Sequence, residues 1–274
     1  TPKNYRAYLA ASDRAQWRTA MELKMDKYLA ANLWTEIDPA TLPKGTQCLG
    51  TLWAFALKWD ADGNCVRNPR ACVIGTPMDP EKFDSFCGTL RHSSANVLMG
   101  IYATYMDLLH ADVADLSDAF QNTRVDQPDS KVPPVYVHQM PGFVKRTPAG
   151  KPFWLLLNCA QQGRRDAGRL FWLAHRQLLK ALLMEVMVWD GEVHKYHVGC
   201  EHGKDVPLRA VLEAAQVESE QSTRIDKQDR PHGWAVIGVH VDDSFRLTTS
   251  ARLRDYIRGG IAVAYAMKVG PLAK

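Results

Sequence analysis

The stretch "VIGVHVDDSFRL", residues 236–247, places two adjacent aspartates inside an otherwise apolar, β-branched run. Side chains of a strand alternate between its two faces, and this alternation breaks at Asp242 and Asp243. Neighbouring carboxylates repel each other and lose hydration on burial, so such a pair belongs either at a solvated turn or around a cation. The stretch therefore predicts a hairpin with two aspartates at its turn. Both explanations of the pair stay open, since Asp is also common in ordinary turns.

A second acidic segment, "ADVADLSDAF" at residues 111–120, carries Asp112, Asp115 and Asp118 at spacings of three. Alone, it could be the polar start of a helix. Together with Asp242 and Asp243 it offers a third carboxylate from a distant part of the chain. Three carboxylates suit two hard divalent cations in a nucleotidyl-transfer site, because Mg²⁺ takes oxygen ligands and keeps positions for substrate phosphates.

Composition and charge set bounds without identifying a partner. The chain has 274 residues, 46% of them apolar and 23% charged, which is ordinary for a soluble globular protein with one large or two smaller domains. Its net charge of +4 is too small to prove a polyanionic partner. Basic residues gather in 164–180 and in 252–274, where they would suit either a phosphate backbone or a solvated helix face.

Cysteine usage and hydropathy bear on location. The six cysteines form no CxxC pair, which favours a reduced, intracellular protein. We find no signal-peptide pattern at residues 1–17. The longest uncharged stretch, 93–106, is shorter than the roughly 20 residues that a membrane span needs. We therefore expect a soluble intracellular protein with no membrane partner.

Hydrophobic periodicity predicts helices mixed with antiparallel hairpins. Trp17, Met21, Met25 and Tyr28 indicate an amphipathic helix, capped by Ser12 and ending near residue 32. Residues 52–75 are predicted to form a hairpin about "DADGN", and 133–143 a short extended segment bounded by prolines. Residues 95–109 and 168–186 look helical. For the second of these helices, the candidates for burial are Leu170, Leu173, Leu178, Leu182 and Leu183.

The remaining segment, 190–232, is polar and is predicted to be irregular, apart from an acidic helix near 208–221. No βαβ alternation is visible, so the fold class predicted is α+β.

Several motifs, read in order, resemble the reverse transcriptase domain of copia-type (pseudovirus) LTR retrotransposons. The segments that carry this resemblance are residues 13–36, "WAFALKWDADGNCVRNPRACVIG" (53–75), "DLSDAFQN" (115–122), "VYVHQMPGF" (135–143), "QQGRRDAGRLF" (161–171), "HVDD" (240–243) and "YAMKVGPL" (265–272). Taken in order, they are spread along nearly the whole chain, from residue 13 to residue 272.

The resemblance implies a right-hand polymerase fold with fingers and palm subdomains, an antiparallel palm sheet with packed helices, and a thumb that is absent or truncated. The implied boundaries are 1–88 and 125–168 for the fingers, and 89–124 and 169–274 for the palm, with a polar insertion at about 190–232. The implied activity is that of an RNA-directed DNA polymerase, a nucleotidyltransferase that adds dNTP to a primer 3′-hydroxyl.

Catalytic and metal-binding positions are carried over by motif. The resemblance puts Asp115, Asp242 and Asp243 in the carboxylate positions that hold two Mg²⁺ ions, with Mn²⁺ as a substitute. Asp115 is preferred over Asp112 because Phe120 follows it at the family's spacing of five. Phe120 then lies under the sugar of the incoming nucleotide, where its ring would exclude a 2′-hydroxyl.

Basic residues are assigned in the same way. Arg70 aligns with the fingers arginine that contacts the triphosphate, a role that suits a guanidinium fork. The residues expected to contact nucleic acid are Arg67, Arg164, Arg165 and Arg169. The sequence departs from the family pattern at Asn68, where a Lys is usual, at Asp166, where a Gln is usual, and at His240, where a Tyr is usual.

The implied partners are an RNA template, a DNA primer and dNTP, with integrase and RNase H segments elsewhere in a Pol polyprotein, in a cytoplasmic virus-like particle or the nucleus. A competing hypothesis is a non-catalytic nucleic-acid-binding or scaffold protein derived from a retroelement. A third is a zinc module, built from His194, His197, Cys200 and His202.

Overall fold

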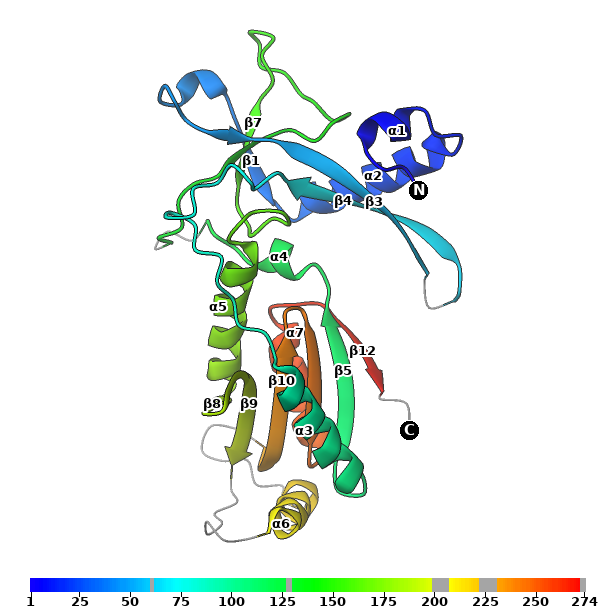
Figure 1. The fold of residues 1–274 in the computed structure, drawn as a ribbon, viewed down its shortest axis with the longest axis vertical. Coiled ribbons are helices and arrows are strands. Elements are labelled where there is room, and N and C mark those ends of the chain that lie inside the picture. The colour runs from blue at the N-terminus through cyan, green and yellow to red at the C-terminus, as the bar shows by residue number, and fades with distance from the viewer. Residues whose placement is uncertain (60–61, 127–129, 199–206, 222–230, 272–274) are drawn as a thin grey trace. The chain divides into compact units, whose positions relative to one another are not determined.

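The computed structural model describes residues 1–59, 62–126, 130–198, 207–221 and 231–271 (Figure 1). The chain forms two compact units. The first contains residues 1–86 and 120–171, and the second contains residues 87–119 and 172–274.

The first unit contains a four-stranded sheet and a two-stranded ribbon. Its elements are α1 (Tyr5–Leu9), α2 (Arg14–Ala30), β1 (Trp34–Ile37), the 3₁₀ turn η1 (Pro39–Thr41), β2 (Cys48–Leu49), β3 (Thr51–Trp59), β4 (Cys65–Val73), β6 (Tyr136–His138) and β7 (Trp154–Leu157). The sheet has the strand order β1-β7-β6-β2, and only β2 and β6 pair in parallel. The ribbon is the antiparallel pair β3–β4.

Helix α2 covers one face of the ribbon. Its apolar positions Trp17, Met21, Met25 and Tyr28 recur every three or four residues, so they form one stripe, and all four are buried as the periodicity predicted. They pack with Trp53 and other residues of the ribbon in one core cluster. The predicted cap is wrong, because the residue before the helix is Asp13, whose side chain makes no capping hydrogen bond.

The second unit is built on a six-stranded antiparallel sheet with the order β12-β5-β11-β10-β9-β8. Its elements are α3 (His92–Thr104), β5 (His110–Leu116), β8 (Glu185–Met187), β9 (Asp190–Val198), α6 (Leu208–Gln221), β10 (Gly233–His240), β11 (Asp243–Thr248), α7 (Ala251–Ala262) and β12 (Met267–Pro271). The chain passes between the units after Phe86, within α4 (Ala119–Asn122) and within α5 (Ala167–Ala181).

The two faces of the six-stranded sheet have different partners. On one face, Leu98 of α3 and Leu212 of α6 pack with Val193, Val236 and Leu247, and Figure 1 shows α3 in front of the sheet. On the other face lies α7. Its Arg258 bonds Asp112 of β5, and its Tyr256 ring lies 6.2 Å from Tyr196 of β9.

The predicted α+β class is confirmed, with three open and mostly antiparallel sheets. The predictions of helices at 95–109 and 208–221 are also confirmed by α3 and α6. The prediction of an irregular segment from residue 190 is wrong, because β9 runs from Asp190 to Val198 between β10 and β8. The polar residues of this segment had suggested exposure, but Glu192 and His194 are buried in the strand.

The buried stripe of α5 also differs from the prediction. Leu173 and Leu183 are exposed, whereas Phe171, His175 and Leu179 are buried at spacings of four. Because His175 is polar, the sequence pattern did not identify the helix face that is buried. No helix in the described ranges combines the length and apolar content needed to cross a membrane.

Candidate functional site

A tight turn at Val241 and Asp242 joins β10 to β11, and the ladder closes at the pair His240 and Asp243. Val241 has φ 56°, in the left-handed region that β-branched residues disfavour. Strained backbone of this kind recurs at functional sites, where the surrounding structure has to hold it in place. The strain belongs to the residue that precedes the two aspartates of the predicted turn.

The pairing of β5 with β11 brings Asp115 beside this turn. Asp115 is the direct cross-strand partner of Asp243, so the two residues share a face of the sheet. The backbone N–H of Leu116 donates a hydrogen bond of 2.9 Å to the carbonyl oxygen of Asp242. Residues more than a hundred positions apart in the sequence therefore lie on adjacent strands, at the same end of the sheet.

Electrostatic repulsion acts among the carboxylates at this end of the sheet. The pKa of Asp243 is raised above its ordinary value, first by partial burial and then by the carboxylates of Asp242 and Asp115. His240 opposes this rise through its own charge. Carboxylate oxygens are ligands that Mg²⁺ prefers, so Asp115, Asp242 and Asp243 fit a divalent cation in kind. Asp115 and Asp243 are both exposed, so their carboxylates are accessible to a cation from solvent.

Within the described ranges, however, no three His, Cys, Asp or Glu side chains converge closely enough to form a ready-made metal centre. For the zinc hypothesis, His194 and His197 are three residues apart on β9 and project to opposite faces of the sheet. Cys200 and His202 lie outside the described residues.

Asp112 has a different environment from Asp115, although both lie on β5. It is 2% exposed, on the face covered by α7, and its carboxylate is held by Arg246 at 2.5 Å and by Arg258 at 2.8 Å. Its charge is therefore already neutralised within the fold. The alternation of strand side chains separates the two carboxylates, because residues at odd spacings point to opposite faces.

The ribbon divides its basic residues between two faces. Arg70 is exposed and has no ion pair with any residue that the structure describes. Lys58 and Asn68 alternate onto the same face. The site residues predicted from the sequence did not include Lys58. Alternation of side chains along the hairpin would have placed Lys58 on the same face as Arg70.

Arg67 lies on the opposite face of the ribbon, toward α2. Its guanidinium pairs with Asp13 at 2.7 Å and lies 5.6 Å from the Trp17 ring centroid. These contacts tie the ribbon to the start of α2, so the proposed nucleic-acid surface does not include Arg67.

The basic run at 164–169 is also divided. The Arg164 side chain is fully buried in a two-bond ion pair with Asp166, at 3.0 and 2.9 Å, so it presents no donor to a surface. This pairing also explains how an aspartate is accommodated at position 166, because Arg164 neutralises its charge inside the fold. Arg165 is exposed, while Arg169 pairs with Asp84 at 3.1 Å. Only Arg165 of these arginines therefore keeps an exposed side chain with no ion pair within the described ranges.

Phe120 lies in α4 and is half-buried. Its ring meets that of Phe171 edge-on, with centroids 6.0 Å apart and an interplanar angle of 79°. Such a contact stabilises the fold and leaves part of the ring accessible.

Neither the comparison with protein-family models nor that with curated proteins gave a match for this chain.

Proposed function

We propose that this chain is an RNA-directed DNA polymerase fragment of a copia-type retroelement, and that Asp115, Asp242 and Asp243 form its catalytic carboxylate site. The observation that carries the proposal is the pairing of Asp115 with Asp243 across β5 and β11, with Asp242 in the adjoining turn. The α+β fold with an antiparallel sheet in the second unit agrees with a palm, and the β3–β4 ribbon agrees with fingers.

In this proposal, the carboxylates hold the divalent cations that activate the primer 3′-hydroxyl and stabilise the leaving pyrophosphate. The chain's own contribution is a set of acidic side chains carried by paired strands at one end of the sheet. Asp115 and Asp242 are the principal ligands, and rotation of the exposed Asp243 carboxylate completes the set. The raised pKa of Asp243 agrees with the assignment, because burial and then repulsion by Asp242 and Asp115 raise it, and a cation would relieve the repulsion.

The test is primer extension on an RNA template with Mg²⁺, using the full chain. Asp115→Asn and Asp242→Asn should each lower the rate by about a thousandfold, since an ion's charge stabilisation is worth several kcal/mol and each tenfold corresponds to about 1.4 kcal/mol. Asp255→Asn is the matched control, because Asp255 is an exposed aspartate of α7 with its own partner, Arg254. If the wild type extends the primer and both site variants extend it at the same rate, the proposal is refuted.

A non-catalytic nucleic-acid-binding protein of retroelement origin is the second candidate. One observation favours it, since the uncharged Asn68 lies on the same face of the ribbon as Arg70, where a lysine would add a cationic contact to a triphosphate. Binding of a template–primer duplex without extension, with affinity that falls as salt rises, would select this candidate.

A further inference from the structure

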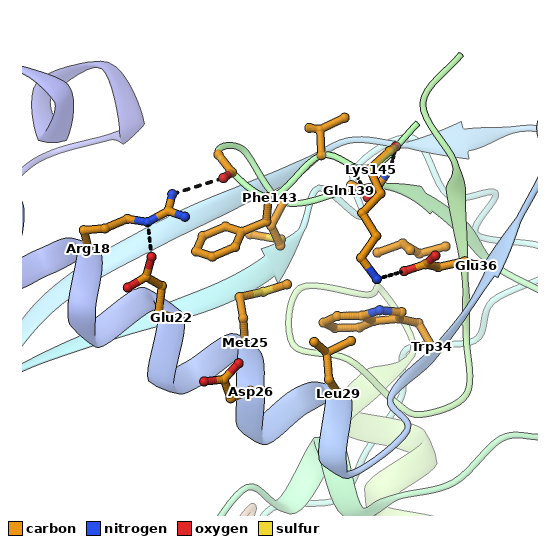
Figure 2. Close-up of a pocket in the computed structure, with 14 residues that line it drawn as sticks. Arg18, Glu22, Met25, Asp26, Leu29, Trp34, Glu36, Gln139, Phe143 and Lys145 are labelled. Atoms are coloured by element: carbon orange, nitrogen blue, oxygen red, sulfur yellow. Dashed lines mark hydrogen bonds and ion pairs between the residues drawn. The ribbon is translucent and has the colours of Figure 1, made fainter. Parts of the chain in front are cut away.

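A pocket of about 350 Å³ lies within the first unit, between α2 and the segment that follows β6 (Figure 2). Met25, Leu29, Trp34, Phe143 and Leu155 supply its apolar lining. This volume falls in the lower part of the range found for ligand pockets. Every lining residue belongs to the first unit, and none of them has a role in the proposed polymerase reaction.

The apolar surface of the pocket is incompletely covered. Leu29 is 45% exposed on α2, and Val144 on the facing segment is also exposed. In Figure 2, the Trp34 ring lies below the Lys145 side chain and beside Leu29, while Phe143 points toward Met25. The lining can therefore receive one bulky apolar group.

The mouth of the pocket carries more negative than positive charge. It has three carboxylates, from Glu22, Asp26 and Glu36, and two cations, from Arg18 and Lys145. Arg18 bonds Glu22 at 2.7 Å and Lys145 bonds Glu36 at 2.6 Å (Figure 2). Asp26 has no ion pair with any residue that the structure describes. The free acceptor at the mouth therefore favours a cationic group and disfavours a phosphate.

One wall of the pocket is an edge strand. Trp34 and Glu36 belong to β1, which ends the order β1-β7-β6-β2 and, among the strands that the structure describes, pairs with β7 alone. An edge strand offers backbone N–H and C=O groups for one more strand. Extended peptides dock by adding to such an edge while their alternate side chains enter neighbouring pockets.

We propose that this pocket docks an extended peptide segment of a partner protein, which carries a bulky apolar residue and, two positions away, a lysine or arginine. Residues i and i+2 of a strand share a face, so the apolar side chain enters beside Leu29 and Trp34 while the cation reaches Asp26. The apolar lining, the unpaired carboxylate and the edge strand all select this occupant over a nucleic acid.

The experiment pans a random dodecapeptide display library on the full chain and then measures the affinity of the enriched peptides by fluorescence anisotropy. Enriched peptides should share an apolar residue and a basic residue at i and i+2. Asp26→Lys and Leu29→Ser should each weaken their binding by about tenfold or more, by placing like charges together and by removing apolar contact.

Two matched controls should bind within about twofold of wild type. Glu81→Lys makes the same reversal of charge at an exposed position outside the pocket, and Leu23→Ser alters a residue of α2 that is 66% exposed and does not line the pocket. All four positions are exposed, and circular dichroism melts establish that each variant is folded.

Three outcomes would overturn the proposal. The first is that no peptide is enriched above background. The second is equal binding by Asp26→Lys, Leu29→Ser and wild type. The third is displacement of the enriched peptides by single-stranded RNA from wild type but not from the pocket variants, which would assign the pocket to nucleic acid.

Discussion

Asp115 and Asp243 face each other as direct partners across the antiparallel strands β5 and β11. Like charges at directly opposed positions destabilise a sheet by up to about 1 kcal/mol, and a leucine or threonine at either position would avoid this cost. The pair is set beside a strained turn at Val241, so two unfavourable features occur at one end of one sheet. A bound cation would turn the repulsion between Asp115 and Asp243 into a favourable interaction of both carboxylates with the cation.

The titration of Asp243 provides a direct test of this electrostatic relationship. Its pKa is raised by partial burial and by its two acidic neighbours, so Asp115→Asn should lower it toward the ordinary value. Because the folded pKa exceeds that of the unfolded chain, ionisation of Asp243 makes folding less favourable as pH rises from about 3.8 through the folded pKa. NMR titration of the side-chain carboxyl carbon measures the pKa. Asp255→Asn should leave it unchanged, and an unchanged pKa in Asp115→Asn would show that the two carboxylates do not interact.

Asp112 should behave as a structural residue rather than a catalytic one. Asp112→Asn leaves Arg246 buried with no anionic partner and loosens the link to Arg258, so we expect a loss of about 3–5 kcal/mol in the free energy of unfolding. Urea denaturation followed by circular dichroism measures it. For the exposed ion pair of Asp255, Asp255→Asn should cost less than about 1 kcal/mol. Comparable losses in both variants would contradict the burial argument.

Sequence patterns were informative where one periodicity acted alone. The spacing of Trp17, Met21, Met25 and Tyr28 located α2 and its buried stripe, and alternation located β10 up to the two aspartates. The patterns failed where tertiary pairing decided the outcome. Nothing local to residues 164–166 shows that Arg164 turns inward to Asp166.

Strand pairing has the same limitation. The register of β5 against β11 places Asp115, rather than Asp112, beside Asp243, and that register depends on contacts between segments more than a hundred residues apart. The sequence offered both carboxylates as candidates, and motif resemblance rather than physical reasoning favoured Asp115. The pocket beside α2 is similarly invisible in the sequence, because its walls come from separated segments.

Two buried histidines should make the second unit sensitive to acid. Burial lowers the pKa of His175 and of His194 to about 4 each, from an ordinary value of 6.5. Their folded pKa lies below the unfolded one, so their contribution to stability is complete above about pH 6.5 and is lost as pH falls toward 4. Each pKa unit corresponds to about 1.4 kcal/mol.

The variant that tests this is His194→Leu. Both ring nitrogens of His194 are buried and have no hydrogen-bond partner among the residues that the structure describes. The residue is 1% exposed, so its removal should flatten the loss of stability between pH 6.5 and 4. It should also stabilise the protein at pH 7 by about 1–3 kcal/mol, the cost of an unsatisfied buried polar group. Urea unfolding at a series of pH values gives both quantities. His197→Leu, at an exposed position of β9, should keep the wild-type pH profile, and an identical profile in His194→Leu would refute the prediction.

Phe120 allows the proposed polymerase to be tested separately from the fold. Its ring is half-buried and meets Phe171 edge-on, so Phe120→Ala should cost less than the roughly 3–5 kcal/mol of a fully buried phenylalanine. If the exposed part of the ring lies under the incoming sugar, the same variant should still extend a primer with dNTP and should also accept ribonucleotides, because the clash with the 2′-hydroxyl disappears. Thermal denaturation run beside dNTP and rNTP extension assays separates the two effects.

Phe171→Leu is the matched control, since it disturbs the same ring contact from the buried side and should lower stability without changing sugar preference. If Phe120→Ala loses stability but discriminates against ribonucleotides as well as wild type does, Phe120 has only a packing role, and the case for the three aspartates is unaffected.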